Sequence, residues 1–150
     1  MNVIEMLEAD HGRIRSLFSD IEGTNDSQEI QDYFDKIDNI LTIHAQAEEL
    51  VLYPELRNYE DTVELIEQGH QEHTESDQMV LAIKSKSPNE SEFKQKVSEL
   101  QEFILNHLDE EEKDLFPKVR QYLNDEKLEQ LATQLKETKS SIVDKVASQS

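Results

Sequence analysis

The chain of 150 residues carries 15 lysines and arginines against 34 aspartates and glutamates, a formal net charge of −19. This length suits one domain, and the charge repels phosphate backbones and anionic lipids, so we expect neither nucleic acid nor a membrane as partner. Only 3 glycines and 3 prolines are present, too few turn residues for an all-β fold, and cysteine is absent, which excludes disulfides and thiolate metal sites. Met1 to Asp10 do not resemble a signal peptide, and we expect a cytoplasmic protein.

Apolar residues recur at steps of three and four in five segments, the pattern of helices that bury one stripe. The expected helices span about residues 2–22 and 27–57, a stretch that begins near residue 61, then residues 88–123 and 125–147. Short loops between long helices favour an antiparallel up-down four-helix bundle. We therefore predict an all-α fold, with a bundle domain over residues 1–123. We expect an additional C-terminal helix over residues 124–150 that packs on the bundle, or else serves a partner, and that frays at its end.

Local signals mark where these helices begin and where they are disturbed. The second, third and fourth helices are expected to have N-terminal caps formed by Asp26 with Glu29, Asp61 with Glu64, and Ser87 with Pro88 and Glu90. Pro54 and Pro117 each lack a backbone donor near the end of a long helix, so a kink or stop is expected there.

Polar residues interrupt the apolar stripes of three helices. His11 falls on the inward face of the first helix, His44 and Glu48 continue the stripe of the second, and His107 and Glu111 continue that of the fourth. Residues four apart on a helix lie only about 40° from each other, so each His–Glu pair should point into the bundle. Buried carboxylates cost several kcal/mol unless they are paired or bind a cation.

The chain contains an internal repeat of two helices. The stretch from His44 to Pro54 reappears 63 residues later, from His107 to Pro117, and Asp10–His11 reappears 62 residues later as Glu72–His73. His70 lies three residues before His73, again on one face. Two helix pairs related by a pseudo-twofold axis would bring all five histidines and both glutamates to a shared centre.

Imidazole and carboxylate ligands without sulfur suit iron, manganese or zinc, and one carboxylate from each of two helices can bridge two ions. The candidate metal ligands are His11, His44, Glu48, His70, His73, His107 and Glu111. If each ion is about six-coordinate, these residues and one bridging oxo or hydroxo group leave one position open for a small ligand. The pattern therefore predicts a dinuclear site.

These residues resemble the hemerythrin family, in particular the bacterial hemerythrin-like proteins named for their His-His-Glu cation-binding motif. The resemblance covers about residues 2–123 and rests on the patterns H-x-x-x-E-E-x-x-L-Y-P and H-x-x-x-E-E-x-x-L-F-P, which begin at His44 and His107. It implies a four-helix bundle that holds two non-haem iron ions. The implied terminal ligands are His11, His44, His73 and His107, and the implied bridges are Glu48 and Glu111.

Some residues keep more than one interpretation. Oxygen-carrying hemerythrins take two histidines from the third helix at four-residue spacing, whereas His70 and His73 are three apart. We favour His70 as the fifth ligand, with a donor to a ligand or a surface residue as alternatives. Asp77 either fixes a ligand histidine or is a solvated residue. Tyr53 is expected to pack in the core, and a place beside the ligand pocket is the alternative.

The expected function is that of a di-iron protein that binds O₂ or a related small ligand, such as peroxide or nitric oxide, for sensing, storage or detoxification. The alternatives are a catalase-like enzyme, an iron donor for repair of metal centres, and a metal-free helical interaction module. Relatives of the iron-donor class carry a cysteine-bearing N-terminal segment, which we do not expect here. We expect His107→Ala to reduce bound metal and Glu49→Ala to matter little, because Glu49 lies about 100° from Glu48 on the helix.

Overall fold

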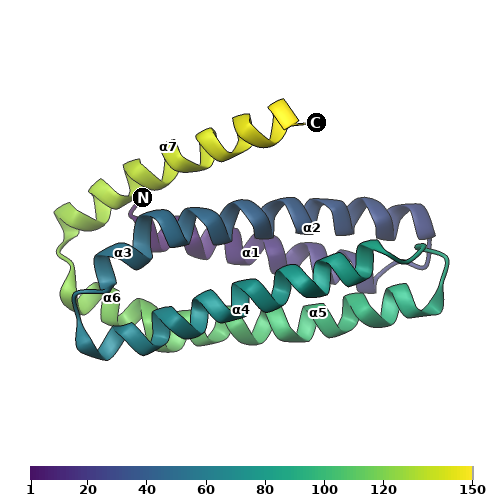
Figure 1. Ribbon diagram of the computed structural model, residues 1–150, viewed down its shortest axis with the longest axis horizontal. Coiled ribbons are helices and arrows are strands. Elements are labelled where there is room, and N and C mark those ends of the chain that lie inside the picture. Colours follow the sequence, from purple (N-terminus) through teal and green to yellow (C-terminus); the bar gives the residue numbers. More distant parts are fainter. Residues whose placement is uncertain (150) are drawn as a thin grey trace.

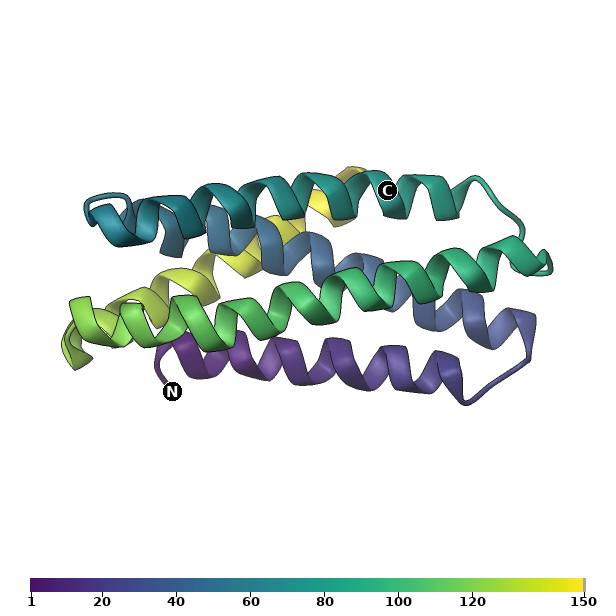
Figure 2. The same ribbon diagram turned by 90° about the horizontal axis from the view of Figure 1, so that it is seen from below.

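A computed structural model describes the backbone of residues 1–149 and the side chains of residues 1–144. Its elements in chain order are α1 (Val3–Glu22), α2 (Ser27–Ala47), η1 (Glu48–Leu52), α3 (Tyr53–Leu56), α4 (Glu60–Lys84), α5 (Ser91–Glu110), η2 (Glu111–Leu115), α6 (Phe116–Tyr122) and α7 (Asp125–Gln149). The four long helices α1, α2, α4 and α5 run alternately up and down as a bundle (Figures 1 and 2). The expected all-α bundle with an additional C-terminal helix is therefore confirmed.

Side-chain caps define the start of the first two helices. The Asn2 side chain accepts a hydrogen bond from the Glu5 backbone at 2.9 Å, and the Glu5 carboxylate accepts one from the Asn2 backbone, also at 2.9 Å. The Asp26 carboxylate accepts from the Glu29 backbone at 3.0 Å, as the sequence predicts. Each such cap satisfies a donor that the first turn leaves free, which contributes about 1 kcal/mol.

The caps expected for the third and fourth helices are wrong. α4 begins at Glu60, with Tyr59 at the N-cap position, and the Asp61 carboxylate instead accepts hydrogen bonds from Tyr122 at 2.6 Å and Lys118 at 2.9 Å. α5 begins only at Ser91. Residues 87–90 form a turn, closed by the bond from the Glu90 backbone to the Ser87 carbonyl, because proline favours the second position of a turn as much as the first turn of a helix.

Both long helices that contain prolines widen into a π-helical turn just before the proline. The turns are η1 and η2, and each ends with a backbone bond five residues back, from Tyr53 to Glu48 and from Phe116 to Glu111. The helix then continues through Pro54 as α3 and through Pro117 as α6. The expected disturbance occurs in both copies of the repeat, and π-helical turns of this kind are frequent at functional sites.

The bundle has two apolar clusters with a polar layer between them. One cluster surrounds Phe18, Phe34 and Phe93 near the α1–α2 turn, and the other surrounds Leu52 and Phe116 at the opposite end. In every long helix the buried histidine lies where the stripe passes from one cluster to the other. The polar layer thus interrupts an otherwise continuous core, and all four helices contribute to it.

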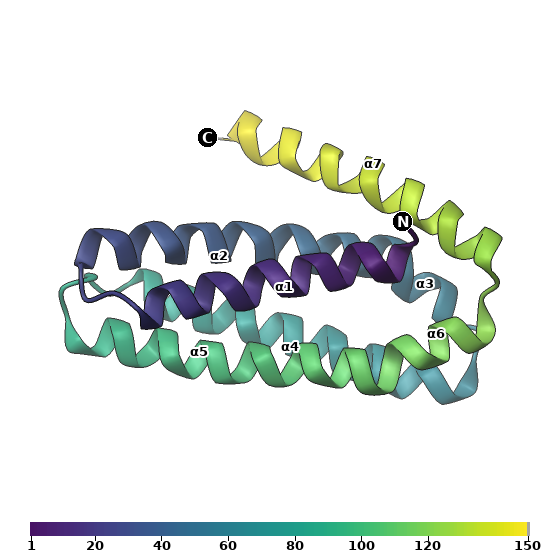
Figure 3. The same cartoon turned by 180° about the vertical axis from the view of Figure 1, so that it is seen from behind.

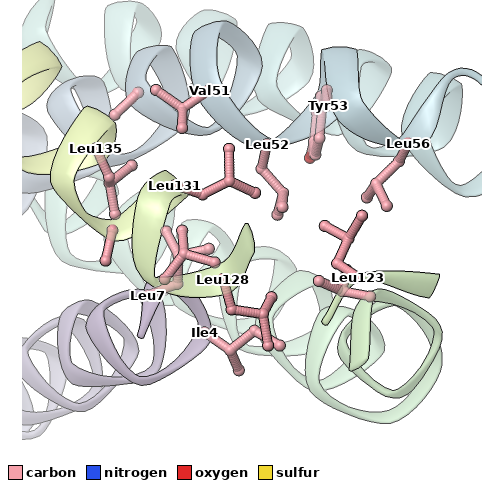
Figure 4. Close-up of a cluster of buried hydrophobic side chains, with 14 of the residues drawn as sticks. Ile4, Leu7, Val51, Leu52, Tyr53, Leu56, Leu123, Leu128, Leu131 and Leu135 are labelled. Atoms are coloured by element: carbon pink, nitrogen blue, oxygen red, sulfur yellow. The ribbon is translucent and has the colours of Figure 1, made fainter. Parts of the chain in front are cut away.

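α7 folds back over the first half of the bundle, where it contacts α1, α2 and η1 (Figure 3). Its residues Leu128, Leu131 and Leu135 are buried and lie among Leu7 and Leu52 in the apolar cluster (Figure 4). The apolar stripe of α7 is thus satisfied within the chain. The fraying expected at its end concerns residues 145–150, whose side chains lie outside the described residues.

Over residues 1–149 we find no helix with the length and apolar character needed to cross a membrane.

Candidate metal centre

Six of the seven candidate ligands converge in the polar layer. They are His11, His44, Glu48, His73, His107 and Glu111, and all six are buried. The fractional exposure of Glu48 is 0% and that of Glu111 is 5%. Burial of this kind is rare for glutamate unless a cation or a hydrogen-bond partner compensates the charge.

The six residues form two overlapping groups that share both glutamates. We call the pair His11 and His44 the first position and the pair His73 and His107 the second position. Within each group of four, one ligand atom from every residue lies within 4.8 Å of the others. Two ions, each held by two histidines and bridged by Glu48 and Glu111, fit this arrangement.

The atoms that would bind metal face only one another, and the Nε2 atoms of His11 and His73 lie 3.2 Å from Glu111 Oε1 and Glu48 Oε1. Among the described side chains, the buried nitrogen and oxygen atoms that make no hydrogen bond are the Nε2 atoms of His11, His44, His73 and His107, Glu48 Oε2 and Glu111 Oε1. Buried polar atoms are otherwise almost always paired. Six unpaired ligand atoms that face one another therefore indicate a site built for cations.

Each ligand histidine makes a hydrogen bond from its other ring nitrogen to a carboxylate. The Nδ1 pairs are His11 with Glu112 at 2.7 Å, His44 with Asp10 at 2.9 Å, His73 with Glu49 at 2.9 Å, and His107 with Glu72 at 2.5 Å. We call Asp10, Glu49, Glu72 and Glu112 the outer carboxylates. Such partners hold Nδ1 protonated, aim Nε2 at the metal and strengthen the imidazole as a ligand.

The outer carboxylates follow the internal repeat and were missed from the sequence. Asp10 and Glu72 precede the repeated histidines of α1 and α4, and Glu49 and Glu112 follow the repeated glutamates. The only feature of the sequence that could have identified them is that both copies of the repeat carry an acidic residue at these positions. The expectation that Glu49→Ala matters little did not include this contact: Glu49 lies in the π-helical turn η1, and its carboxylate reaches His73 of α4.

Asp77 makes no hydrogen bond to a histidine among the described residues, so it is not the partner of a ligand. Burial raises its pKa. The carboxylate that fixes His73 comes from η1, across the helix interface, rather than from the next turn of α4. A hydrogen-bond partner chosen across an interface cannot be read from helical spacing alone.

The structure places His70 outside the centre. Its side chain is 62% exposed, and its Nδ1 lies 2.5 Å from Glu49 Oε1. Because His70 precedes His73 by three residues, it lies about 60° away around α4 and about 4.5 Å along it. Glu49 stands between the two histidines and accepts from both. The expectation of a fifth histidine ligand is therefore not met in this arrangement.

Tyr53 lies at the centre rather than only in the core. Its hydroxyl donates to Glu48 Oε1 at 3.0 Å, and Glu111 Oε2 is 3.4 Å away. Its ring stacks on His73, with centroids 5.8 Å apart. Gly69 of α4 makes room for it, since a Cβ at this position would overlap the Tyr53 hydroxyl.

The residues at equivalent positions of the repeat differ, and only one half has the tyrosine hydroxyl. Phe116, the counterpart of Tyr53, stacks on His11 with centroids 5.7 Å apart. Leu7 stands at the counterpart of Gly69, 62 residues earlier, and is fully buried. A phenylalanine and a leucine thus occupy in one half the space that a tyrosine and a glycine occupy in the other.

The two glutamates differ in electrostatics. Burial and the charge of Glu48 raise the pKa of Glu111 well above its ordinary value. Burial also opposes the charge of Glu48, but His44 and His73 outweigh it and hold the pKa of Glu48 well below its ordinary value. Burial and both carboxylates raise the pKa of Tyr53, which keeps its hydroxyl protonated. Of the two glutamates, Glu111 is therefore the one whose protonated form the surroundings favour.

A narrow pocket leads to the centre between α4 and η2. Its volume is about 30 Å³, and its lining includes Tyr53, Gly69, His107, Glu111 and Leu115. A space of this size admits about two molecules of the size of water. The pocket therefore offers room for a very small molecule beside the centre.

Comparisons with known proteins agree with this geometry. The family described as "Hemerythrin HHE cation binding domain" matches residues 2–119. The crystal structure of a hemerythrin HHE cation binding domain-containing protein from Mycobacterium kansasii superposes with a TM-score of 0.82 at 24% identity, covering 98% of this chain and 93% of that one. That likeness shows the fold.

Two relatives extend the comparison. A protein named "DNA nickase" from Nostoc sp. is 38% identical over 152 residues, which cover 99% of this chain and 42% of the relative. A hemerythrin-like protein from Schizosaccharomyces pombe is 28% identical over 135 residues, covering 89% of this chain and 66% of that protein. The chain thus spans less than two thirds of each relative. Since the family match covers most of the chain and falls on the repeated ligand motifs, this protein belongs to the hemerythrin HHE cation-binding family.

Proposed function

We propose that this chain binds two iron ions and uses them to bind O₂ or a related small ligand, such as peroxide or nitric oxide, for sensing, storage or detoxification. The observation that carries the proposal is the set of six unpaired, buried ligand atoms arranged in two groups around Glu48 and Glu111. Bound iron would supply reversible one-electron chemistry at each ion. The donor set, rich in histidine and without sulfur, suits iron.

The residues of the chain contribute orientation, proton control and exclusion of water. The outer carboxylates fix the tautomer of all four histidines, so their Nε2 atoms stay free for metal. The Tyr53 hydroxyl holds its proton between the two glutamates, where it can donate to a bound ligand. Apolar clusters on both sides of the polar layer keep bulk water out.

The test is the metal content of protein washed with chelator after purification without added metal. We expect about two irons per chain for the wild type and for His70→Ala, and less than one for His107→Ala. The His70 variant is the matched control, because it removes an exposed histidine of the same helix bundle. Wild-type protein that retains no metal even after anaerobic ferrous loading would refute the proposal and favour a metal-free interaction module.

Catalase-like decomposition of peroxide is the second candidate function. Tyr53 favours it, because a protonated hydroxyl at the centre can donate a hydrogen bond to a bound peroxide. Oxygen evolution from H₂O₂ should then fall at least tenfold in Tyr53→Phe while the iron content stays near two. Equal rates for the variant and the wild type would leave ligand binding as the function.

We do not extend DNA nicking to this chain. The net charge of −19 opposes contact with a phosphate backbone, and the matched region is less than half of the Nostoc protein. The proposed partner remains a small ligand, with no nucleic acid and no membrane. A gel-shift experiment at low salt that detected binding to DNA would contradict this view.

A further inference from the structure

The two positions have the same inner residues but different surroundings. Behind the first position, both outer carboxylates are bound by cations. Arg15 donates to both oxygens of Glu112, at 3.0 and 3.2 Å, and the Lys139 ammonium contacts Asp10. The Lys139 side chain is 21% exposed, so this ion pair is only partly screened by water.

Behind the second position, the outer carboxylates have no such cations. Glu72 accepts from the neutral amide of Gln68 at 3.1 Å, and the same amide binds the carboxylate of Glu110 at 2.9 Å. Glu49 accepts from the exposed His70. Over the described side chains, no ion pair from a lysine or arginine reaches either outer carboxylate of this position. Its surroundings are therefore more negative.

The asymmetry has two sources, Arg15 of α1 and Lys139 of α7, and α7 lies outside the repeat. It packs on α1, α2 and η1, all in the first half of the bundle. Lys139 and Asp10 are 129 residues apart in sequence, and Lys139 lies beyond the family match at residues 2–119. The counterpart of Asp10 in the repeat is Glu72, whose carboxylate accepts a hydrogen bond from the neutral Gln68 side chain instead of contacting a lysine. The chain thus adds one helix that acts on one position only.

A cation behind an outer carboxylate has two effects on a metal. It draws negative charge away from the hydrogen bond to the ligand histidine, which weakens that histidine as a donor. It also places a positive charge near the position where the metal cation must bind, and the two charges repel each other. Both effects lower the affinity of the first position for a divalent cation, and neither acts on the second position.

We propose that the two metal positions are unequal, that the second position takes the first divalent cation, and that Lys139 of α7 is a positioning residue that weakens the first position through Asp10 and His44. This inference rests on the proposed function, because it needs both positions to bind metal. The affinity difference should be about tenfold, which is the size that residues behind metal ligands commonly produce.

The test is a titration of the full, chelator-stripped chain with zinc, followed through the ¹⁵N shifts of the histidine ring nitrogens. At one zinc per chain, Nε2 of His73 and His107 should show the coordinated shift while Nε2 of His11 and His44 remains free. At two zincs all four should be shifted. Parallel movement of all four, or earlier movement of the first position, would overturn the inference. If no ring nitrogen shifts at any ratio, the proposed function itself fails.

Variants of α7 separate charge from structure. Lys139→Met should bring the two zinc dissociation constants, measured by calorimetry, to within about threefold, whereas Lys139→Arg should keep the tenfold gap. Lys136→Met, which removes an exposed lysine one turn earlier on α7, is the matched control. An unchanged gap in Lys139→Met, or the same change in Lys136→Met, would overturn the role of Lys139. Urea midpoints of all three variants show whether α7 remains packed.

Discussion

The substitution Gly69→Ala should destabilise the chain although it lies within a helix. In an exposed helix, this change stabilises a protein by about 0.5–1 kcal/mol, because alanine loses less backbone freedom than glycine. Here the new Cβ would overlap the Tyr53 hydroxyl and lie 3.1 Å from its Cζ. The movement of Tyr53 is restricted, since its side chain is fully buried and its ring stacks on His73.

The magnitude follows from these contacts. Overpacking in a filled core costs about 1–3 kcal/mol. A displaced phenol also leaves Glu48 and Glu111 without their donor, which costs about 1–3 kcal/mol more. After the gain in helix propensity is subtracted, we expect Gly69→Ala to lower the free energy of unfolding by about 1–5 kcal/mol.

Urea denaturation of the chelator-stripped protein measures this change. Gly12→Ala is the matched control, because a Cβ at Gly12 meets no atom within 4 Å, and it should raise the stability by about 0.5–1 kcal/mol. The double variant Gly69→Ala, Tyr53→Phe lacks the overlapping oxygen. Its loss of stability should therefore be at least about 1 kcal/mol smaller than the sum of the losses of the two single variants. Equal stability of the Gly69 and Gly12 variants would refute the reasoning.

Three further predictions concern metal, pH and packing. Glu49→Ala should weaken zinc binding about 10–100-fold in calorimetry, because His73 loses the acceptor that fixes it. Burial and the charge of Glu48 raise the pKa of Glu111, so metal binding should displace a proton from this carboxyl up to a higher pH than from an ordinary glutamate. Affinity should then rise with pH, and the binding enthalpy should vary with the ionisation enthalpy of the buffer. Leu131→Ala should lower the free energy of unfolding by about 2–5 kcal/mol in urea, because the fully buried side chain leaves a cavity.

Each of these has its own control. Asp77→Ala removes a carboxylate near His73 that forms no hydrogen bond with it, and zinc affinity should change less than threefold. For proton release, a binding enthalpy that is the same in all buffers would contradict the assignment of the proton to Glu111. Leu81→Ala truncates a leucine of α4 that is 65% exposed and should cost less than about 0.5 kcal/mol. A similar cost for the Leu81 and Leu131 variants would show that α7 does not stabilise the bundle.

Much of the fold follows from local patterns along the chain. The 3.6-residue periodicity of apolar positions fixes which face of each helix is buried, and the literal repeat between His44 and His107 fixes that the two halves are alike. Six of the seven candidate ligands meet in one layer for the same reason. The N-terminal cap at Asp26 could also be predicted from the sequence, since it depends on a contact with a residue only three positions away.

The remaining features depend on which helices become neighbours. His70 and Glu49 lie near the same buried stripes, yet only the packing of α4 on η1 makes one a surface residue and the other the partner of His73. The contact of Lys139 with Asp10 joins residues 129 positions apart. Helical periodicity places a residue to within a face of its helix, whereas a hydrogen bond requires placement to within a fraction of an ångström. Short-range patterns along the chain are thus enough to predict the bundle and the six candidate ligands at its centre, whereas the carboxylates and cations around them depend on contacts between helices that are distant in sequence.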